Sequence, residues 1–373
     1  MKKLFGFLTV TTVFLAINGC MRNDDEPVMP IRPIARLYIS VGNYQTNASE
    51  DPIANVLLID PADTSDMEVV LSHDSEALRG GTGIYFDPFE STLFQAGGYT
   101  GGDTTIRVMS VGPLGILSNS GNIQFRGLNG MRGLTYHQPS KYLYVANNSS
   151  ADGPTIYGYH LPKNRRGYTR PHRVLRLDPS MRPWGLVMWK DSLLLSNASP
   201  TNGGVSLYGG LFNADSLVTD YQPLATVTIE GATAIRGIAF VDSLDVLVAA
   251  DYGTGDFNAP VADGRIYIIE GIKAKLTSGS HTTVSPTRVI QGAATGLTGP
   301  LDVAVDPRRD RRTIFVADYD AQVPGGQRGR ILRFRLSDDG NVAPHASISL
   351  DTLGNARRPF GLFLDVRGVP GSQ

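Results

Sequence analysis

The apolar residues of this chain fall into short runs that are rich in β-branched and aromatic side chains and are bounded by turn residues. Runs of this kind predict β-strands, and hardly any helix is predicted. Two stretches of the chain show three such runs in the same order, namely Gly237–Asp242, Val246–Asp251 and Gly264–Ile269, and then Leu301–Asp306, Ile314–Asp318 and Gly329–Phe334.

Weaker copies of the first run make the pattern a repeat along the whole chain. They start at Gly83, Gly133 and Gly185, so the five starts lie 50, 52, 52 and 64 residues apart. A fourth run, such as Arg288–Ile290, completes most units. Four strands repeated at this period are typical of the blades of a β-propeller.

The two ends of the chain complete each other. Arg358–Asp365 matches a first strand that no second strand follows, whereas Arg36–Val41 and Asn55–Asp60 match second and third strands that lack a first. Joining the ends makes a sixth blade and leaves no sheet edge open. The sequence therefore predicts an all-β fold, a six-bladed β-propeller closed by pairing of the N- and C-terminal strands, rather than a β-sandwich with accidental repeats.

The blade motif, Gly-Ile-Ala-x-Val-Asp followed by Val-Ala-Asp and Gly-Arg-Ile, resembles that of the NHL and lactonase-like six-bladed β-propellers. The likeness is specific in the copies at 237 and 301, looser elsewhere, and spans residues 36–365. It implies a ring whose top face carries the loops before the inner strands, where a site would lie. It also implies that the N-terminal segment joins the ring at the bottom.

The first residues have the pattern of a secretory signal. Lys2 and Lys3 precede an apolar run over 4–17 that is too short for a membrane-spanning helix. The segment Leu15–Cys20 resembles a bacterial lipobox, which implies that its cysteine is lipidated. An ordinary secretory signal and a free thiol are the alternatives.

A lipid on Cys20 would anchor the protein in the bacterial outer membrane. The acidic run at 24–26 resembles an export signal of surface lipoproteins, which implies display at the cell surface; a solvated tether is the alternative, and a periplasmic orientation stays open. The predicted organisation is a signal peptide at 1–19, a lipidated tether at 20–35 and the propeller at 36–373.

Composition narrows the classes of partner and site. The chain of 373 residues has 34 basic and 35 acidic residues, so it lacks the positive excess of a nucleic-acid-binding protein. The 41% hydrophobic content fills a core and excludes a disordered chain. One cysteine excludes a disulfide framework, and no nucleophile elbow, phosphate loop or metal-binding histidine spacing occurs.

Arginines precede most of the predicted inner strands. Around a central pore they would hold a carboxylate, sulfate or phosphate, or else tie neighbouring blades together. The arginines proposed for ligand binding are Arg132, Arg182, Arg236 and Arg358, with Arg79 at the same repeat position. Tyr252 and Tyr319 follow second strands and would stack on a sugar ring. The predicted ligand is a glycan, an anionic small molecule or a protein partner.

Asparagine and aspartate also stand where second strands end, and their oxygens suit a hard cation such as Ca²⁺. The resemblance to lactonase-like propellers implies a divalent cation at the pore mouth, held by side chains from several blades. The residues at comparable positions are Asn147, Asn197, Asp251 and Asp318. No acidic residue stands at the equivalent place in the first blade, and turn formation is the other role of such residues.

Two classes of function agree with these patterns. The first is a cell-envelope lipoprotein whose top face binds a ligand. The alternative is a metal-dependent hydrolase or lactonase that uses a cation at the pore mouth to activate water. A third possibility is a scaffold for a partner lipoprotein. The residues leave open whether the protein is an enzyme.

Overall fold

The computed structural model describes residues 34–44, 53–98, 102–149, 153–199, 203–212, 216–255, 261–320, 328–351 and 357–367. The predicted signal peptide, Cys20 and nearly all of the predicted tether lie outside the described residues. No helix within these ranges is long and apolar enough to cross a membrane. The helices are the short 3₁₀ elements η1 (Pro162–Asn164), η2 (Asp242–Leu244), η3 (Ile272–Lys275) and η4 (Ala293–Thr295).

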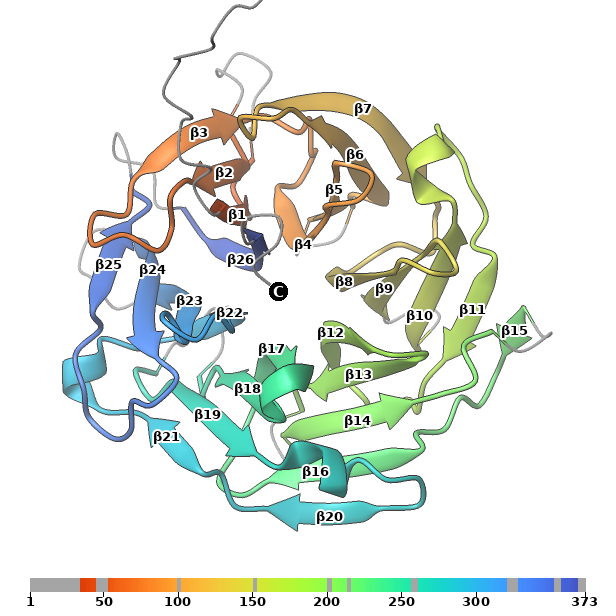
Figure 1. Cartoon of the computed structure of the whole chain (residues 1–373). Coiled ribbons are helices and arrows are strands. Elements are labelled where there is room, and N and C mark those ends of the chain that lie inside the picture. Colours follow the sequence, from red (N-terminus) through yellow and green to blue (C-terminus); the bar gives the residue numbers. More distant parts are fainter. Residues whose placement is uncertain are drawn as a thin grey trace, which may run out of the picture. The chain divides into compact units, whose positions relative to one another are not determined.

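Six sheets surround a central axis, and the fold is an all-β six-bladed β-propeller, as predicted (Figure 1). Each blade has four antiparallel strands, numbered along the chain and ordered from the axis outward. Blade 1 is β26 (Pro359–Arg367), β1 (Ile34–Val41), β2 (Val56–Ile59) and β3 (Val69–His73). Blade 2 is β4 (Gly81–Asp87), β5 (Thr92–Gly97), β6 (Thr105–Val111) and β7 (Leu117–Gln124).

The next two blades each gain a fifth strand, which pairs in parallel at the outer edge. Blade 3 is β8 (Met131–His137), β9 (Tyr142–Ser149), β10 (Gly153–His160) and β11 (Arg173–Arg176), with β15 (Leu217–Val218). Blade 4 is β12 (Pro183–Trp189), β13 (Ser192–Asn197), β14 (Gly204–Tyr208) and β16 (Ala225–Ile229), with β20 (His281–Val284).

The last two blades return to four strands. Blade 5 is β17 (Ile235–Val241), β18 (Val246–Asp251), β19 (Arg265–Glu270) and β21 (Arg288–Ile290). Blade 6 is β22 (Pro300–Asp306), β23 (Thr313–Asp320), β24 (Arg328–Arg335) and β25 (Ala346–Ser349). The ring therefore closes in blade 1, where β26 from the end of the chain pairs with β1 from its beginning.

The core consists of apolar layers between neighbouring blades. The layer between blades 4 and 5, for example, joins Leu194 and Val205 to Ile238, Leu247 and Tyr267. Middle strands such as β2 and β18 are buried on both faces, whereas the outer strand β3 alternates between half-buried and exposed residues. Continuous apolar runs and alternating runs are the patterns expected for fully and half-buried strands.

The inner strands approach one another so closely that only glycine fits at one position in most of them. A Cβ atom on Gly133 would lie 2.5 Å from the carbonyl oxygen of Trp184 in the next blade. Because that oxygen belongs to the backbone, it cannot move aside as a side chain would. The glycines at this position are Gly83, Gly133, Gly185, Gly237 and Gly361.

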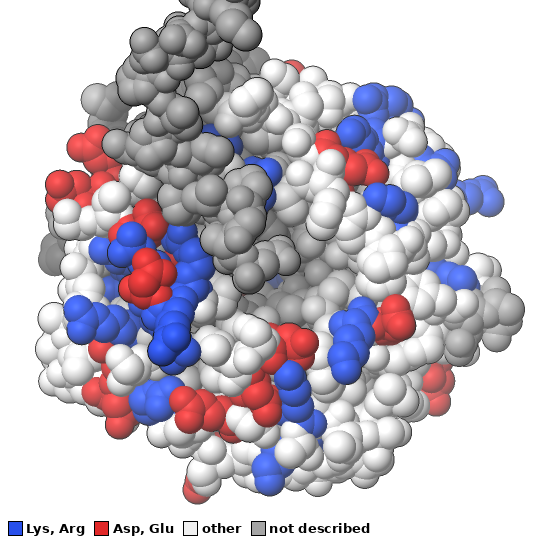
Figure 2. All heavy atoms as spheres, viewed as in Figure 1, with Lys and Arg blue, Asp and Glu red and all other residues white. Residues whose placement is uncertain are grey.

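These contacts also define two faces. Equivalent glycines lie beside one another around the ring, so the inner strands all run in the same direction. We call the face where they begin the top face and the face where they end the bottom face. Ile34 pairs with Arg367 at the bottom face, onto which Figures 1 and 2 look. The described chain therefore begins at the bottom, as expected.

Candidate functional site

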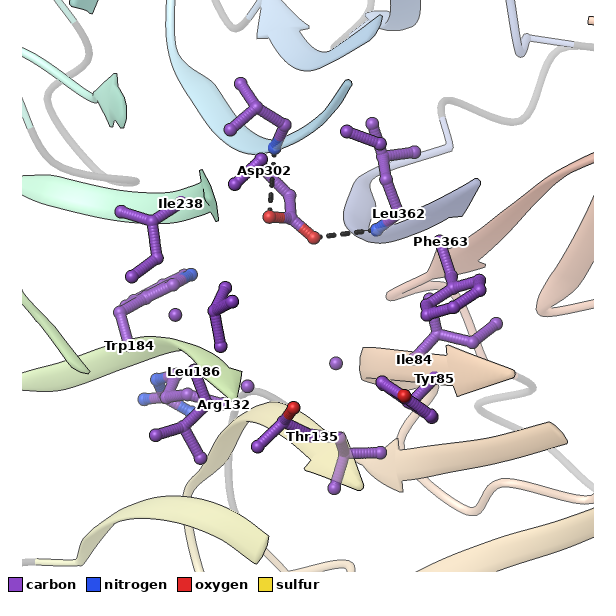
Figure 3. A pocket seen from close by; sticks show the side chains of 18 of the residues that line it. Ile84, Tyr85, Arg132, Thr135, Trp184, Leu186, Ile238, Asp302, Leu362 and Phe363 are labelled. Atoms are coloured by element: carbon purple, nitrogen blue, oxygen red, sulfur yellow. Dashed lines mark hydrogen bonds between the residues drawn. The ribbon is translucent and has the colours of Figure 1, made fainter. Parts of the chain in front are cut away.

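A cavity of about 220 Å³ lies on the axis of the ring, lined by inner strands of all six blades (Figure 3). Its walls are mostly apolar, with Ile84, Leu186 and Ile238 among the lining side chains. Arg132 and Asp302 are the charged residues in its described lining. An apolar cavity with a few polar groups is the usual form of a small-molecule site.

Asp302 stands on β22 at the position that is glycine in the other five inner strands. Its carboxylate points into the cavity, where Oδ1 accepts a hydrogen bond from Val303 N at 2.9 Å and Oδ2 accepts one from Leu362 N at 2.7 Å (Figure 3). Burial raises the pKa of Asp302 to about 7, although both N–H donors lower it. The group therefore changes charge near neutral pH.

Sequence comparison missed this residue because it aligned the ends of the repeated runs. That alignment places Leu301 opposite Gly237. Strand pairing instead makes Pro300 equivalent to Ile235, so Asp302 is the equivalent of Gly237. The sequence does contain a signal for this residue, because the copy at 301 lacks the glycine that the other first runs share.

Trp184 carries two arginines at the top end of the cavity. Arg132 Cζ lies 5.1 Å from the centroid of the indole and Arg236 Cζ lies 4.5 Å from it. Arg236 Cζ also lies 3.4 Å from the centroid of Tyr252. All four side chains are buried, and their cation–π contacts join blades 3, 4 and 5. Arg132 and Arg236 therefore connect neighbouring blades in the structure.

Arg358 joins the same region through Tyr319. Its Nε donates to the tyrosine hydroxyl at 2.8 Å, and its Cζ lies 4.9 Å from the ring centroid. Tyr319 packs with Trp184, Tyr252 and Phe360 in one apolar cluster, which we call the top cluster. Arg132, Arg236 and Arg358 thus border a single cluster.

The tyrosines lie differently from the open platform that we expected. Tyr252 and Tyr319 are 1% and 0% exposed. The loop before β22 covers Tyr252, because a Cβ atom on Gly299 would lie 2.6 Å from its ring. Burial raises the pKa of Tyr319 to about 12. A sugar could stack on either ring only if the top cluster opened, so this conformation does not support the predicted stacking.

Two arginines at the same repeat position lie outside the top cluster. Arg182 is exposed, and its backbone N–H donates to Asn197 Oδ1 at 3.0 Å. Arg79 Nη1 donates to the hydroxyl of Tyr44 at 3.3 Å. The structure therefore brings together three of the five arginines and leaves Arg79 and Arg182 elsewhere on the top face.

The aspartates predicted as metal ligands close the loops of their own blades. Asp251 accepts three hydrogen bonds of 2.8 to 2.9 Å from Thr233 and Ala234. Asp318 accepts bonds of 2.9 and 3.0 Å from the backbone of residues 298 and 299, and it pairs with Arg330 at 2.6 Å. These contacts hold the loop before each inner strand, which is the turn role named as the alternative.

The two asparagines predicted as metal ligands differ in their hydrogen bonding. Asn197 Oδ1 accepts hydrogen bonds from the N–H groups of Arg182 and Ser199. Asn147 is fully buried, and neither polar atom of its amide has a hydrogen-bond partner among the described residues. The four predicted ligands lie on the second strands of four blades, β9, β13, β18 and β23. Across the described ranges, no group of three or more His, Cys, Asp and Glu residues could hold a metal ion.

No family model and no curated protein matches the chain. It is similar to a solved structure from Bacteroides fragilis NCTC 9343, provisionally named 6-phosphogluconolactonase, with a TM-score of 0.52, 11% identity and coverage of 91% of this chain and 100% of that one. A protein of Bacteroides uniformis ATCC 8492 with the same provisional name gives 0.50, 12%, 90% and 100%. The periplasmic gluconolactonase PpgL of Pseudomonas aeruginosa gives 0.50, 13%, 89% and 99%. At these identities the likeness shows the fold alone, that of a β-propeller.

Proposed function

We propose that this propeller binds a small hydroxylated carboxylate, such as a sugar acid, in the axial cavity. The observation that carries the proposal is that Arg132 and Asp302 line one apolar cavity from blades 3 and 6, which face each other across the ring (Figure 3). Of the anionic ligands that the sequence predicted, this cavity suits one that also has a hydroxyl group to donate a hydrogen bond to Asp302.

The two charged side chains suit the two ends of such a ligand. A guanidinium offers several N–H donors in the planar arrangement that a carboxylate accepts. Each oxygen of Asp302 accepts one backbone N–H, which leaves a lone pair for a ligand hydroxyl. The apolar walls exclude water and strengthen both contacts.

The size of the cavity limits the ligand. Its volume of about 220 Å³ lies below the range of about 300–1,000 Å³ that is usual for drug-sized ligands. A monosaccharide acid is of suitable size, and a glycan would enter only by one terminal residue. Arg236 and Arg358 border the top cluster and would attract the ligand toward the cavity.

Calorimetric titration with D-gluconate, D-galacturonate and D-glucose tests the proposal. We expect the two acids to bind and the neutral sugar to bind at least about tenfold more weakly, because it lacks the charge that pairs with Arg132. Arg132→Gln should abolish binding. Arg182→Gln is the matched control, since Arg182 has the same repeat position but is exposed and does not line the cavity. Equal losses in both variants would refute the assignment.

We also place the protein at the bacterial outer membrane, anchored through Cys20 and displayed at the cell surface. The support is the signal pattern before Cys20 and the start of the described chain at the bottom face, which would turn the top face outward. Cys20→Ser should abolish metabolic labelling with a fatty acid. Protease treatment of intact cells should remove the wild-type protein if it faces outward and spare it if it faces the periplasm.

Lactone hydrolysis in the same cavity is a second candidate, favoured by Asp302. A carboxylate with a pKa of about 7 can accept a proton from water near neutral pH while that water attacks a lactone carbonyl. The gluconolactonase names of the neighbours agree with this chemistry. Hydrolysis of glucono-lactone that is lost in Asp302→Asn and unaffected by EDTA would establish it. Loss of the hydrolytic activity with EDTA would instead favour the predicted metal-dependent hydrolase. If no lactone is hydrolysed, ligand binding remains the proposed function.

A further inference from the structure

A second charged site lies far from the axis, in the connection between β10 and β11. Residues 153–177 contain Lys163, Arg165, Arg166, Arg170, Arg173 and Arg176 and no acidic residue. The chain as a whole has a net charge of −1, so this excess is local. A local run of one sign produces a field that attracts the opposite charge.

The connection folds into a polar pocket of about 490 Å³. Arg165, Arg166, Arg170 and His172 line it together with Tyr168 and Thr169. Burial lowers the pKa of His172, and the neighbouring Arg165 and His160 lower it further, as expected where positive charges gather.

Backbone carbonyl groups hold two of these guanidinium groups. Arg166 Nη1 donates to the carbonyl oxygens of Lys163 and Arg165 at 3.0 and 2.7 Å, and Arg165 Nε donates to that of His160 at 3.2 Å. Among the described residues, no carboxylate lies within ion-pair distance of Arg165, Arg166 or Arg170. The pocket therefore keeps its positive charge and is held in place before any ligand arrives.

The outer strand of blade 2 fixes the connection. Gly167 N donates to Asn122 Oδ1 at 2.8 Å, and Gly167 O accepts from Gln124 N at 2.9 Å. Thr169 N donates to Gln124 O at 2.9 Å. These bonds attach the connection to β7, so the arginines project from an ordered surface.

The pocket belongs to the bottom face. His160, at the end of β10, pairs with Tyr142, which pairs with His137 at the end of the inner strand β8. Inner strands end at the bottom face, where Ile34 also lies. Figure 2 shows basic side chains at the rim of this face, over η1 and the β10–β11 connection.

A lipid anchor would bring this face toward the membrane. Thirteen residues separate Cys20 from Ile34, and a fully extended segment of that length reaches about 45 Å. A basic patch beside a lipid anchor is a usual second contact with an anionic membrane surface.

We propose that this pocket binds the phosphate groups of anionic lipid headgroups and so forms a second membrane contact beside the predicted lipid on Cys20. Guanidinium groups bind phosphate oxygens through paired, charge-assisted hydrogen bonds. The proposal goes beyond the ligand site on the axis and does not depend on it.

Vesicle sedimentation tests the proposal with residues 21–373, which carry no lipid and contain the whole closed ring from β1 to β26. The chain should bind phosphatidylglycerol vesicles and not phosphatidylcholine vesicles. Arg166→Gln with Arg170→Gln should weaken binding roughly 30-fold, the effect of two basic residues near a charged surface. Both arginines are exposed, so the melting temperature should not change.

Arg309→Gln with Arg335→Gln is the matched control, because it removes the same charge from exposed positions on the same face. We expect it to weaken vesicle binding less than about threefold, since Asp310 and Asp338 lie nearby in sequence. Equal losses of vesicle binding in the two double variants would contradict the pocket as the binding site. They would show that the positive charge of the whole face attracts the anionic vesicles. The wild-type chain could instead bind inorganic phosphate saturably but fail to bind vesicles, with the Arg166/Arg170 variant losing the phosphate binding. That result would show that the pocket binds a free phosphate compound and not a membrane lipid.

Discussion

Asp302 departs from the repeat, because it places a carboxylate in the axial cavity where the other inner strands have glycine. Five inner strands carry glycine there, because the backbone of the next strand leaves no room for a Cβ atom. In blade 6 the side chain turns into the cavity and accepts two backbone N–H groups instead. Of the arginines predicted to bind a ligand, Arg132 lines this cavity, whereas Arg236 and Arg358 border the top cluster. The sequence could not show that Tyr252 and Tyr319 are covered, since that depends on how loops from several blades pack.

The raised pKa of Asp302 predicts a specific pH dependence of stability. Its folded pKa of about 7 lies above the ordinary value of 3.8, so the folded state binds more protons between these values. Proton binding by Asp302 therefore stabilises the folded state most below pH 3.8, and this stabilisation is lost as pH rises from 3.8 to about 7. Asp302→Asn removes the titration. Relative to the wild type, its free energy of unfolding should rise between about pH 4 and about pH 7 by up to roughly 4 kcal/mol.

Urea denaturation of both proteins across this pH range measures that difference. The absolute stabilities can differ, because the amide of Asn accepts only one of the two N–H groups. The pH dependence is what matters. A difference in unfolding free energy that stays constant with pH would show that the pKa of Asp302 is not raised in the folded protein.

At the scale of elements, periodicity predicted the inner strands and most of the fourth strands, including Arg288–Ile290 as β21. It failed in two places. The first run of blade 6 was aligned one residue early, because run ends do not reveal the bulge near the start of each inner strand. The edge strands β15 and β20 were not predicted, because each is short and is added to a blade by the path of a connection rather than by the repeat.

The glycine position of the inner strands can be tested with two alanine substitutions. Gly133→Ala would bring a Cβ atom within 2.5 Å of the Trp184 carbonyl oxygen and should destabilise the protein, by about 1–3 kcal/mol or more. Gly112→Ala is the control, because its nearest contact would be an ordinary 3.6 Å. Denaturant midpoints that fall equally in both variants would contradict the close approach of the inner strands as the reason for glycine, since alanine at an uncrowded position should not destabilise the protein.

At the scale of the molecule, closure was predictable because the unmatched runs at the two ends complement each other. The observed register pairs Ile34 with Arg367 and continues to Val41 with Pro359. The axial site was not predictable, because its lining comes from six strands spread over residues 82–364 that meet only in the closed ring. Repeats predict which strands reach the axis, but they do not predict which side chains face one another across it.

Closure should be essential for the fold. A chain ending at Asp351 lacks β26 and leaves β1 as an open edge beside the exposed core of blade 1. We expect it to lose cooperative thermal unfolding by circular dichroism and to aggregate in size-exclusion chromatography. A chain ending at Arg367 retains β26 and should unfold as the full chain does. Cooperative unfolding of the shorter chain would contradict ring closure as the basis of stability.

A crystal structure with D-gluconate tests the binding site most directly. The account predicts the ligand in the axial cavity, with its carboxylate within hydrogen-bond distance of Arg132 and a hydroxyl donating to Asp302. The same crystals of Arg132→Gln should show no ligand there. Gluconate bound elsewhere on the ring, or held in the cavity without contact to either residue, would contradict the proposed function.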